Sequence, residues 1–172
     1  MGPKEAKSLA IRYLLIIAAA LLGSYLYYAL LPITIYPVYF ILNLFYSTSI
    51  IGNLLVFDGK EIEIIRACVG ASAISLLLIL NLATPSIKMA RRASLALASI
   101  LLFLAFNWTR IIILDYLYLE DYLLFGQMHL FSWYFASTVA VALIWIFCAR
   151  CFNIKDIPFW SDVSYLLKKS RK

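Results

Sequence analysis

The sequence predicts an all-α integral membrane protein with about four transmembrane helices, an outer interfacial segment and a small extracytoplasmic β-hairpin. Three observations predict it: 65% of the 172 residues are hydrophobic, the mean hydropathy is +0.92, and the few charged residues gather between long apolar runs. Such runs are typical of helices that cross a bilayer. The length fits a single membrane domain over residues 1–172. The net charge of +6 then indicates membrane topology rather than a nucleic-acid partner.

Four apolar runs have about the 20 residues that are needed to cross the hydrocarbon core. These predicted transmembrane helices are residues 9–31, 69–87, 93–114 and 130–148. Residues 33–57 are apolar enough to form a fifth span. However, Pro32 and Pro37 interrupt the start of that segment, and polar residues are scattered through it.

The basic residues decide between four and five spans. If residues 33–67 form an outer interfacial segment and hairpin, only Lys60, Arg66 and Arg110 of the 15 basic residues remain outside. Cytoplasmic loops carry such an excess of Lys and Arg. We therefore expect four spans in the cell membrane, both termini inside, and a basic cytoplasmic tail over residues 149–172.

A short hairpin is predicted within the outer segment. Asp58 and Gly59 separate two short runs, and Asp-Gly is a strong signal for a two-residue hairpin turn. Residues 61–64 alternate between Glu and Ile, as a half-buried strand does. The hairpin leads to Arg66 and Cys68 at the start of the second predicted span.

Three candidate functional side chains are predicted at the outer ends of the spans. Cys68 begins the second span, where a helix N-terminus would lower the pKa of the thiol. Arg110 lies near the outer end of the third span, inside the apolar stretch, where an arginine is energetically costly unless it has a partner or a function. His129, the single histidine, opens the fourth. Each one alone also fits a purely structural role: Cys68 and His129 as packing residues, and Arg110 as an anchor at the membrane interface.

Together the three residues have the chemistry of a thiolate acyl-transfer site. A thiolate attacks a carbonyl, an imidazole moves protons, and a guanidinium stabilises the oxyanion. Asn107 lies one helical turn before Arg110 and shares its face. The sequence therefore predicts an active site that faces the extracytoplasmic side.

The order of these motifs resembles a known enzyme family. Cys68 and Gly70 lie in Ala-Cys-Val-Gly-Ala-Ser, Asn107 and Arg110 in Asn-Trp-Thr-Arg, and His129 in Met-His-Leu-Phe. This set, with a hairpin before the cysteine, resembles the exosortase/archaeosortase family of membrane cysteine transpeptidases. The resemblance covers residues 36–146.

The resemblance implies a thiol protease that cleaves C-terminal sorting signals of exported, membrane-anchored proteins. Such a signal consists of a short motif, a transmembrane helix and a basic tail. The new carboxyl end is then transferred to a lipid acceptor of the bilayer. Cys68 would be the nucleophile, His129 the acid/base, Arg110 the transition-state stabiliser and Asn107 a supporting residue.

The chain departs from the family pattern directly after the cysteine. Family members usually have Ser or Thr there, whereas this chain has Val69. Ser72, one helical turn further on, can partly replace the missing hydroxyl, so Gly70 and Ser72 join Asn107 as supporting candidates.

Two cysteines, Cys148 and Cys151, form a Cys-x-x-Cys pair at the inner end of the last span. The tail offers no second pair and no histidine for a zinc site, so we expect reduced, structural cysteines, no metal and no cofactor. Neither cysteine can pair with Cys68 across a membrane.

Two other functions remain open from the residues alone. A non-catalytic membrane scaffold or transporter subunit would have the same composition, but it would not need Cys68, Arg110 and His129 to converge. A simple intramembrane cysteine protease would use the same three residues with water as the acceptor.

Overall fold

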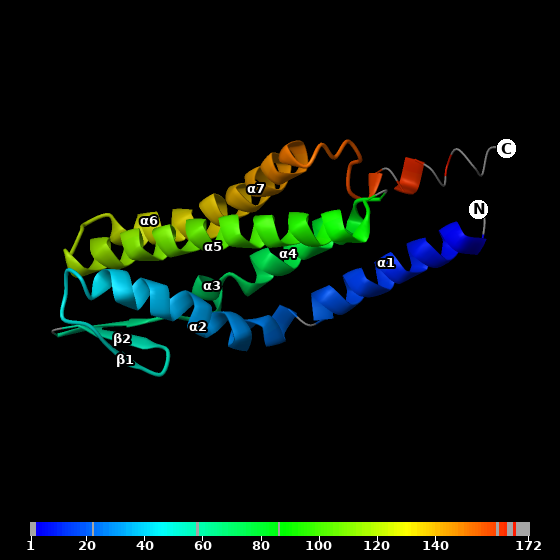
Figure 1. Cartoon of the computed structure of the whole chain (residues 1–172). Coiled ribbons are helices and arrows are strands. Elements are labelled where there is room, and N and C mark those ends of the chain that lie inside the picture. Colours follow the sequence, from blue (N-terminus) through cyan, green and yellow to red (C-terminus); the bar gives the residue numbers. More distant parts are fainter. Residues whose placement is uncertain are drawn as a thin grey trace.

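The computed structural model describes residues 3–21, 23–57, 59–85, 87–160, 162–164 and 167. It is mostly helical and carries one small antiparallel sheet (Figure 1). The helices are α1 (Pro3–Leu21), α2 (Gly23–Leu42), α3 (Arg66–Val69), α4 (Ala71–Ala83), α5 (Met89–Leu119), α6 (Phe125–Phe131), the π-helical turn η1 (Ser132–Ala136) and α7 (Ser137–Cys151). The strands are β1 (Ser49–Ile51), β2 (Leu54–Phe57) and β3 (Lys60–Glu63).

The predicted fold class is confirmed. Among the described residues, three helical stretches are long and apolar enough to cross a membrane, namely Tyr25–Leu42, Met89–Leu119 and Phe125–Cys151. Two shorter apolar helices, Leu9–Leu21 and Ala71–Ala83, accompany them. The expected first span, residues 9–31, is divided between α1 and α2, and the second corresponds to the short helix α4.

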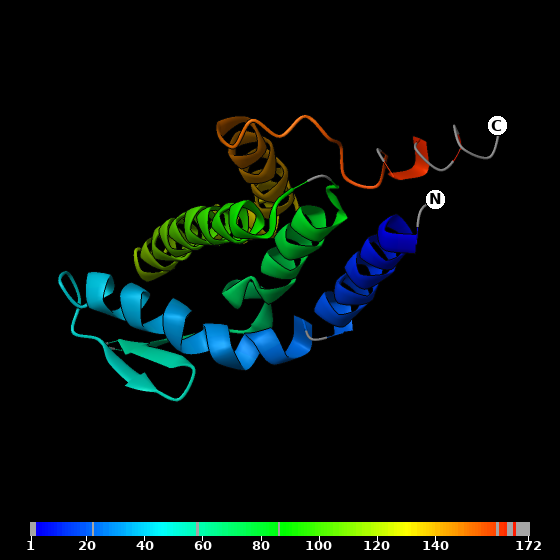
Figure 2. The same cartoon turned by 45° about the vertical axis from the view of Figure 1, so that its right-hand side comes forward.

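Helix α4 lies at the centre of the bundle. It contacts α1, α2, α5 and α7, and Figure 2 shows it between α1 and α5. The sheet and α6 lie at one end of the bundle, whereas the start of α1 and the end of α7 lie toward the other end (Figure 1). One buried core, which includes Val38, Leu55, Ile74 and Phe103, joins α2, the sheet, α4 and α5.

Helix α2 continues through the two prolines that we expected to interrupt it. A proline inside a helix leaves the carbonyl four residues earlier without its N–H partner. For Pro37 that carbonyl belongs to Ile33, and the indole Nε1 of Trp108 donates a hydrogen bond to it at 3.0 Å. A side chain from α5 thus replaces the lost bond, which explains why the helix runs past the position at which the sequence suggested a break.

The expected hairpin is present as β2 and β3, and the sheet has an additional strand. Phe57 pairs with Lys60 across a two-residue connection in which Gly59 has φ +81°. Asp58, the other predicted turn residue, lies outside the described residues. Strand β1 adds to β2 on the far side, giving the order β1-β2-β3. The sequence did not predict β1, because it falls within the apolar segment 33–57.

The expected basic tail is described only in part. Residues 161, 165, 166 and 168–172 of this tail lie outside the described residues. Asp162 forms an ion pair with Arg12 of α1, so the described part of the tail packs against the first helix.

Candidate active site

Cys68 lies in α3, a four-residue helix between the sheet and α4. Helix α3 ends at Val69, and Gly70 follows as its C-cap with φ +73°. A Cβ atom at Gly70 would also lie 2.6 Å from Cε1 of the buried Phe103. Only glycine fits both constraints, so the chain turns here instead of continuing into α4. The sequence placed Cys68 at the start of a long apolar helix; in the structure Cys68 lies in the short helix α3, and the helix that follows starts at Ala71.

The break at Gly70 leaves the carbonyl of Cys68 available to other donors. Asn107 Nδ2 donates to it at 2.8 Å, and Arg110 Nη2 donates a longer bond at 3.4 Å. Asn107 is only 1% exposed. The two residues lie one turn apart on α5, as the sequence predicted, and both hold the backbone of the cysteine. Asn107 thus fixes the position of Cys68.

Arg110 points into the protein. Its Nη1 donates to Ser137 Oγ at 3.1 Å, and that hydroxyl donates to the carbonyl of Ser132 at 3.0 Å. Ser132 and Ser137 bound the π-helical turn η1, a kind of turn that often marks functional sites. Arg110 Nε is buried and has no hydrogen-bond partner among the described residues. These contacts do not fit an arginine that merely extends toward the membrane interface.

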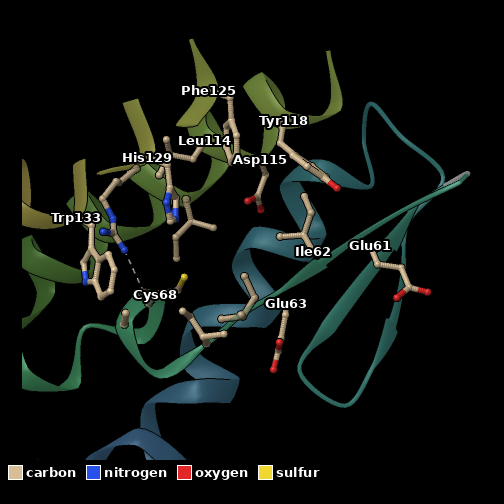
Figure 3. Close-up of a pocket in the computed structure, with 15 residues that line it drawn as sticks. Glu61, Ile62, Glu63, Cys68, Leu114, Asp115, Tyr118, Phe125, His129 and Trp133 are labelled. Carbon is tan, nitrogen blue, oxygen red and sulfur yellow. Dashed lines mark hydrogen bonds between the residues drawn. The ribbon is translucent and has the colours of Figure 1, made fainter. Parts of the chain in front are cut away.

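Cys68, Arg110 and His129 line one cavity of about 260 Å³. The Cys68 sulfur points into it, and the His129 ring lies on the same side (Figure 3). The rings of Phe125 and Trp133 flank His129, with centroid distances of 5.7 Å and 6.5 Å. The structure therefore brings together three side chains that are separated by 42 and 19 positions in the sequence.

Asp115 also lines this cavity, and the sequence reasoning missed it as a site residue. It is 6% exposed, and its Oδ2 has no hydrogen-bond partner in the described part of the chain. Arg110 lines the same cavity. The predicted third span, residues 93–114, ends one residue before Asp115 and so leaves it in an outer loop. An acidic residue within an apolar helix is itself a signal of function, and the observed helix α5 includes Asp115.

Burial raises the pKa of the Cys68 thiol, while the Arg110 guanidinium acts in the opposite direction. Cys68 lies outside α4 and outside the three candidate spans. The expected lowering by a helix N-terminus does not apply, since the cysteine is not at the start of α4. The thiol therefore needs a base, and His129 is the histidine that shares its cavity.

Ser72 does not line the cavity of Cys68, Arg110 and His129. It is exposed and lines a second cavity of about 770 Å³ on the bundle side, together with Gly70, Asn107 and Arg110. The hydroxyl that was expected to replace the missing Ser or Thr is thus on the other side of the break at Gly70.

The structure also locates the remaining cysteines. Cys148 is buried and Cys151 is exposed near the end of α7, both as free thiols. Within the described residues, no group of three or more His, Cys, Asp or Glu side chains is arranged to hold a metal ion.

Comparison with known proteins identifies the family. A family model described as transmembrane exosortase matches residues 1–146. No curated protein and no solved structure matches the chain. The matched region includes α3 with Cys68, α5 with Arg110 and α6 with His129. The chain therefore belongs to the transmembrane exosortase family, a family of multi-pass membrane proteins that process sorting signals.

Proposed function

We propose that this protein is a cysteine transpeptidase that cleaves C-terminal sorting signals and transfers the new carboxyl end to a lipid. The observation that carries this proposal is the cavity shared by Cys68, Arg110 and His129. A scaffold or transporter subunit does not require a thiol, a guanidinium and an imidazole at one cavity. An acyl-transfer enzyme does.

In the first step, His129 takes the proton of the Cys68 thiol, and the sulfur attacks the scissile carbonyl carbon. A general base is needed because burial raises the pKa of this thiol. The tetrahedral intermediate then collapses, the C–N bond breaks, and His129 returns the proton to the leaving amine. The products are a thioester on Cys68 and a released fragment that carries the transmembrane helix and the basic tail.

Arg110 stabilises the negative oxygen of the tetrahedral intermediate. Its guanidinium is held by bonds to the Cys68 carbonyl and to Ser137, while Nε has no partner among the described residues. Donors that are already held in place cost no reorganisation when the charge develops. Asn107 is a positioning residue, because its side-chain amide donates a hydrogen bond to the backbone carbonyl of the nucleophile, Cys68.

In the second step, an acceptor attacks the thioester and Cys68 is released as a thiol. His129 removes a proton from the incoming hydroxyl or amine as the new bond forms. A lipid acceptor reaches the thioester from the bilayer, whereas water gives simple hydrolysis. The product of the reaction distinguishes the two: a lipidated carboxyl end or a free one.

In this proposal the cavity faces the extracytoplasmic side. The end of the bundle that carries the sheet also carries Glu61, Glu63 and Asp115. The basic residues Arg91 and Arg92 lie in the first turn of α5, at its opposite end. The positive-inside rule places that basic end in the cytoplasm.

The test uses cells that express this protein with a reporter. The reporter ends in the motif, helix and basic tail of a protein from the same genome. Cys68→Ala should abolish cleavage while the protein remains inserted in the membrane. Cys68→Ser should be nearly inactive, because a serine hydroxyl is a weaker nucleophile than a thiol.

Cys151→Ala is the matched control, because Cys151 is exposed in the last turn of α7, away from the cavity. It should cleave the reporter as the wild type does. Full cleavage by Cys68→Ala would overturn the proposal.

A further inference from the structure

Strand β3 has a free edge. The sheet order is β1-β2-β3, and in the part of the chain that the structure describes β3 has no strand on its other side. Ile64 N donates to Asn53 O at 2.9 Å, and the hydrogen-bonded pairs of an antiparallel ladder alternate along a strand. Ile62 therefore also turns its peptide groups toward β2. The N–H groups of Glu61 and Glu63 face away from it.

This free edge forms one wall of the cavity and leads to the nucleophile. Residues 61–65, 67 and 68 all line the cavity. The facing wall includes Leu114, Asp115 and Tyr118 from α5 and Phe125 and His129 from α6. Figure 3 shows Ile62 of β3 pointing toward Asp115 and Tyr118 across this space, while Glu61 and Glu63 point away.

Lys60 of β3 bonds to the end of α5 and so connects the two walls at the end of the cavity that is farther from Cys68. Its Nζ donates to Leu119 O at 2.7 Å and to Asp121 Oδ1 at 2.6 Å, at the end of α5. The space between β3 and α5 is thus a slot whose walls are fixed at one end by Lys60, and which opens to the thiol of Cys68 at the other.

We infer that the motif of the sorting signal binds in this slot as an added β-strand, parallel to β3. An extended peptide commonly binds by adding to an exposed sheet edge, where backbone hydrogen bonds supply affinity. Here the N–H groups of Glu61 and Glu63 donate to carbonyls of the motif. The scissile carbonyl then arrives beside Cys68, because β3 leads into α3. This inference rests on the proposed function.

The direction of the added strand follows from the order of the segments in the sorting signal: the motif, the cleavage site and then the transmembrane helix. The transmembrane helix of the signal comes after the cleavage site and has to enter the bilayer. Strand β3 runs from the hairpin turn toward α3, which carries Cys68 and lies next to the start of α4 (Figure 1). A motif that runs the same way delivers its following helix to the membrane. An antiparallel motif would direct that helix outward.

Asp115 determines which motif residues fit. Successive side chains of a strand point to opposite faces, so alternate motif residues turn toward α5. There they meet the unpartnered Oδ2 of Asp115 among the apolar side chains of Leu114 and Ile62. A buried acceptor without a partner favours a ligand that donates a hydrogen bond. The motif residue that faces α5 is therefore one that carries an N–H or O–H donor.

The first test removes one peptide N–H from the free edge. Glu61→Pro lacks this N–H but leaves the bonds between β3 and β2 intact, since an edge strand tolerates proline where its N–H faces away from the ladder. Glu61→Ala at the same position removes only the carboxylate. Cleavage of the reporter by the proline variant should be roughly tenfold slower than by the alanine variant, the effect of about one lost hydrogen bond. Equal rates would overturn the inference.

The second test reads the strand direction and does not depend on a proline. A photoreactive amino acid replaces Glu61 or Glu63 in a Cys68→Ala background, and the cross-linked position on the reporter is mapped by mass spectrometry. Parallel pairing predicts that both positions cross-link to reporter residues that precede the cleavage site, with position 63 nearer that site than position 61. Cross-links to residues that follow the cleavage site, or no cross-link from either position, would overturn the inference.

Wild-type protein in the same cells separates this inference from the proposed function. If the wild type fails to cleave the reporter, the proposed function is wrong, and the strand addition that rests on it falls too. If the wild type cleaves the reporter but the proline and alanine variants are equal, only the strand addition is wrong.

Discussion

Replacing Gly70 with alanine should inactivate the protein without unfolding it. The residue has φ +73°, and a positive φ costs an alanine about 1–2 kcal/mol. The new Cβ would also lie 2.6 Å from Phe103 Cε1, so the two atoms must separate by about 0.8 Å to reach an ordinary contact of 3.4 Å. Because Phe103 is 1% exposed and closely packed, this overlap adds about 1–3 kcal/mol.

The movement at Gly70 is expected to reach Cys68, two residues earlier. A misplacement of about 1 Å at a reacting group can cost about 100-fold in rate. We therefore expect Gly70→Ala to cleave the reporter about 100-fold more slowly. Expression and membrane insertion should persist, and the melting temperature in detergent should fall.

Gly52→Ala is the matched control for backbone strain. Gly52 has φ +65°, but no described atom lies within 4 Å of a Cβ built there. This variant should lose stability by about 1–2 kcal/mol from the backbone alone and keep its activity. Gly70→Asn adds a second comparison, since asparagine tolerates a positive φ but still meets Phe103. Normal cleavage by Gly70→Ala or Gly70→Asn would refute the argument that contact with Phe103 positions the nucleophile.

Three further predictions address the charge, the thiol and the topology. Arg110→Lys should insert normally but cleave the reporter about 100- to 1000-fold more slowly, because a lysine lacks the planar fork of donors. His129→Gln should behave similarly. Near-normal cleavage by Arg110→Lys would instead make the arginine an interface anchor. In a protein whose other two cysteines are replaced by serine, alkylation of Cys68 by iodoacetamide should rise with pH around a midpoint above that of a free cysteine, because burial raises the pKa of this thiol. Arg110→Gln should raise the midpoint further by removing the opposing charge, and a midpoint below the ordinary value would contradict the burial of the thiol. A membrane-impermeant maleimide on intact cells should label a variant whose single cysteine is Cys68 and spare one whose single cysteine is Cys151; the opposite pattern would invert the proposed topology.

The sequence was sufficient to locate the three main candidates. A cysteine, an arginine within an apolar helix and a lone histidine are each unusual at the end of a span, and the order of the motifs indicated the family. Asn107 was found because helical spacing places it on the face of Arg110. The structure adds that both donate to the Cys68 carbonyl.

Other parts of the site depend on contacts that no local pattern reveals. Asp115 was missed because the end of an apolar helix is hard to place to within a few residues. Ser137 is an ordinary hydroxyl in an apolar helix until the structure shows its bond to Arg110. The turn at Gly70 was missed because its need for glycine comes partly from Phe103, 33 positions away.

The central claim is that Cys68 forms a thioester with the substrate. The protein and reporter would be mixed in detergent, denatured in acid and digested, and the peptides would be examined by mass spectrometry. We predict that the new carboxyl end of the reporter is attached to Cys68, that hydroxylamine removes it, and that Cys68→Ala shows no adduct and no cleavage. A reporter that is cleaved by Cys68→Ala, or an adduct on Cys148 or Cys151 instead, would contradict the account.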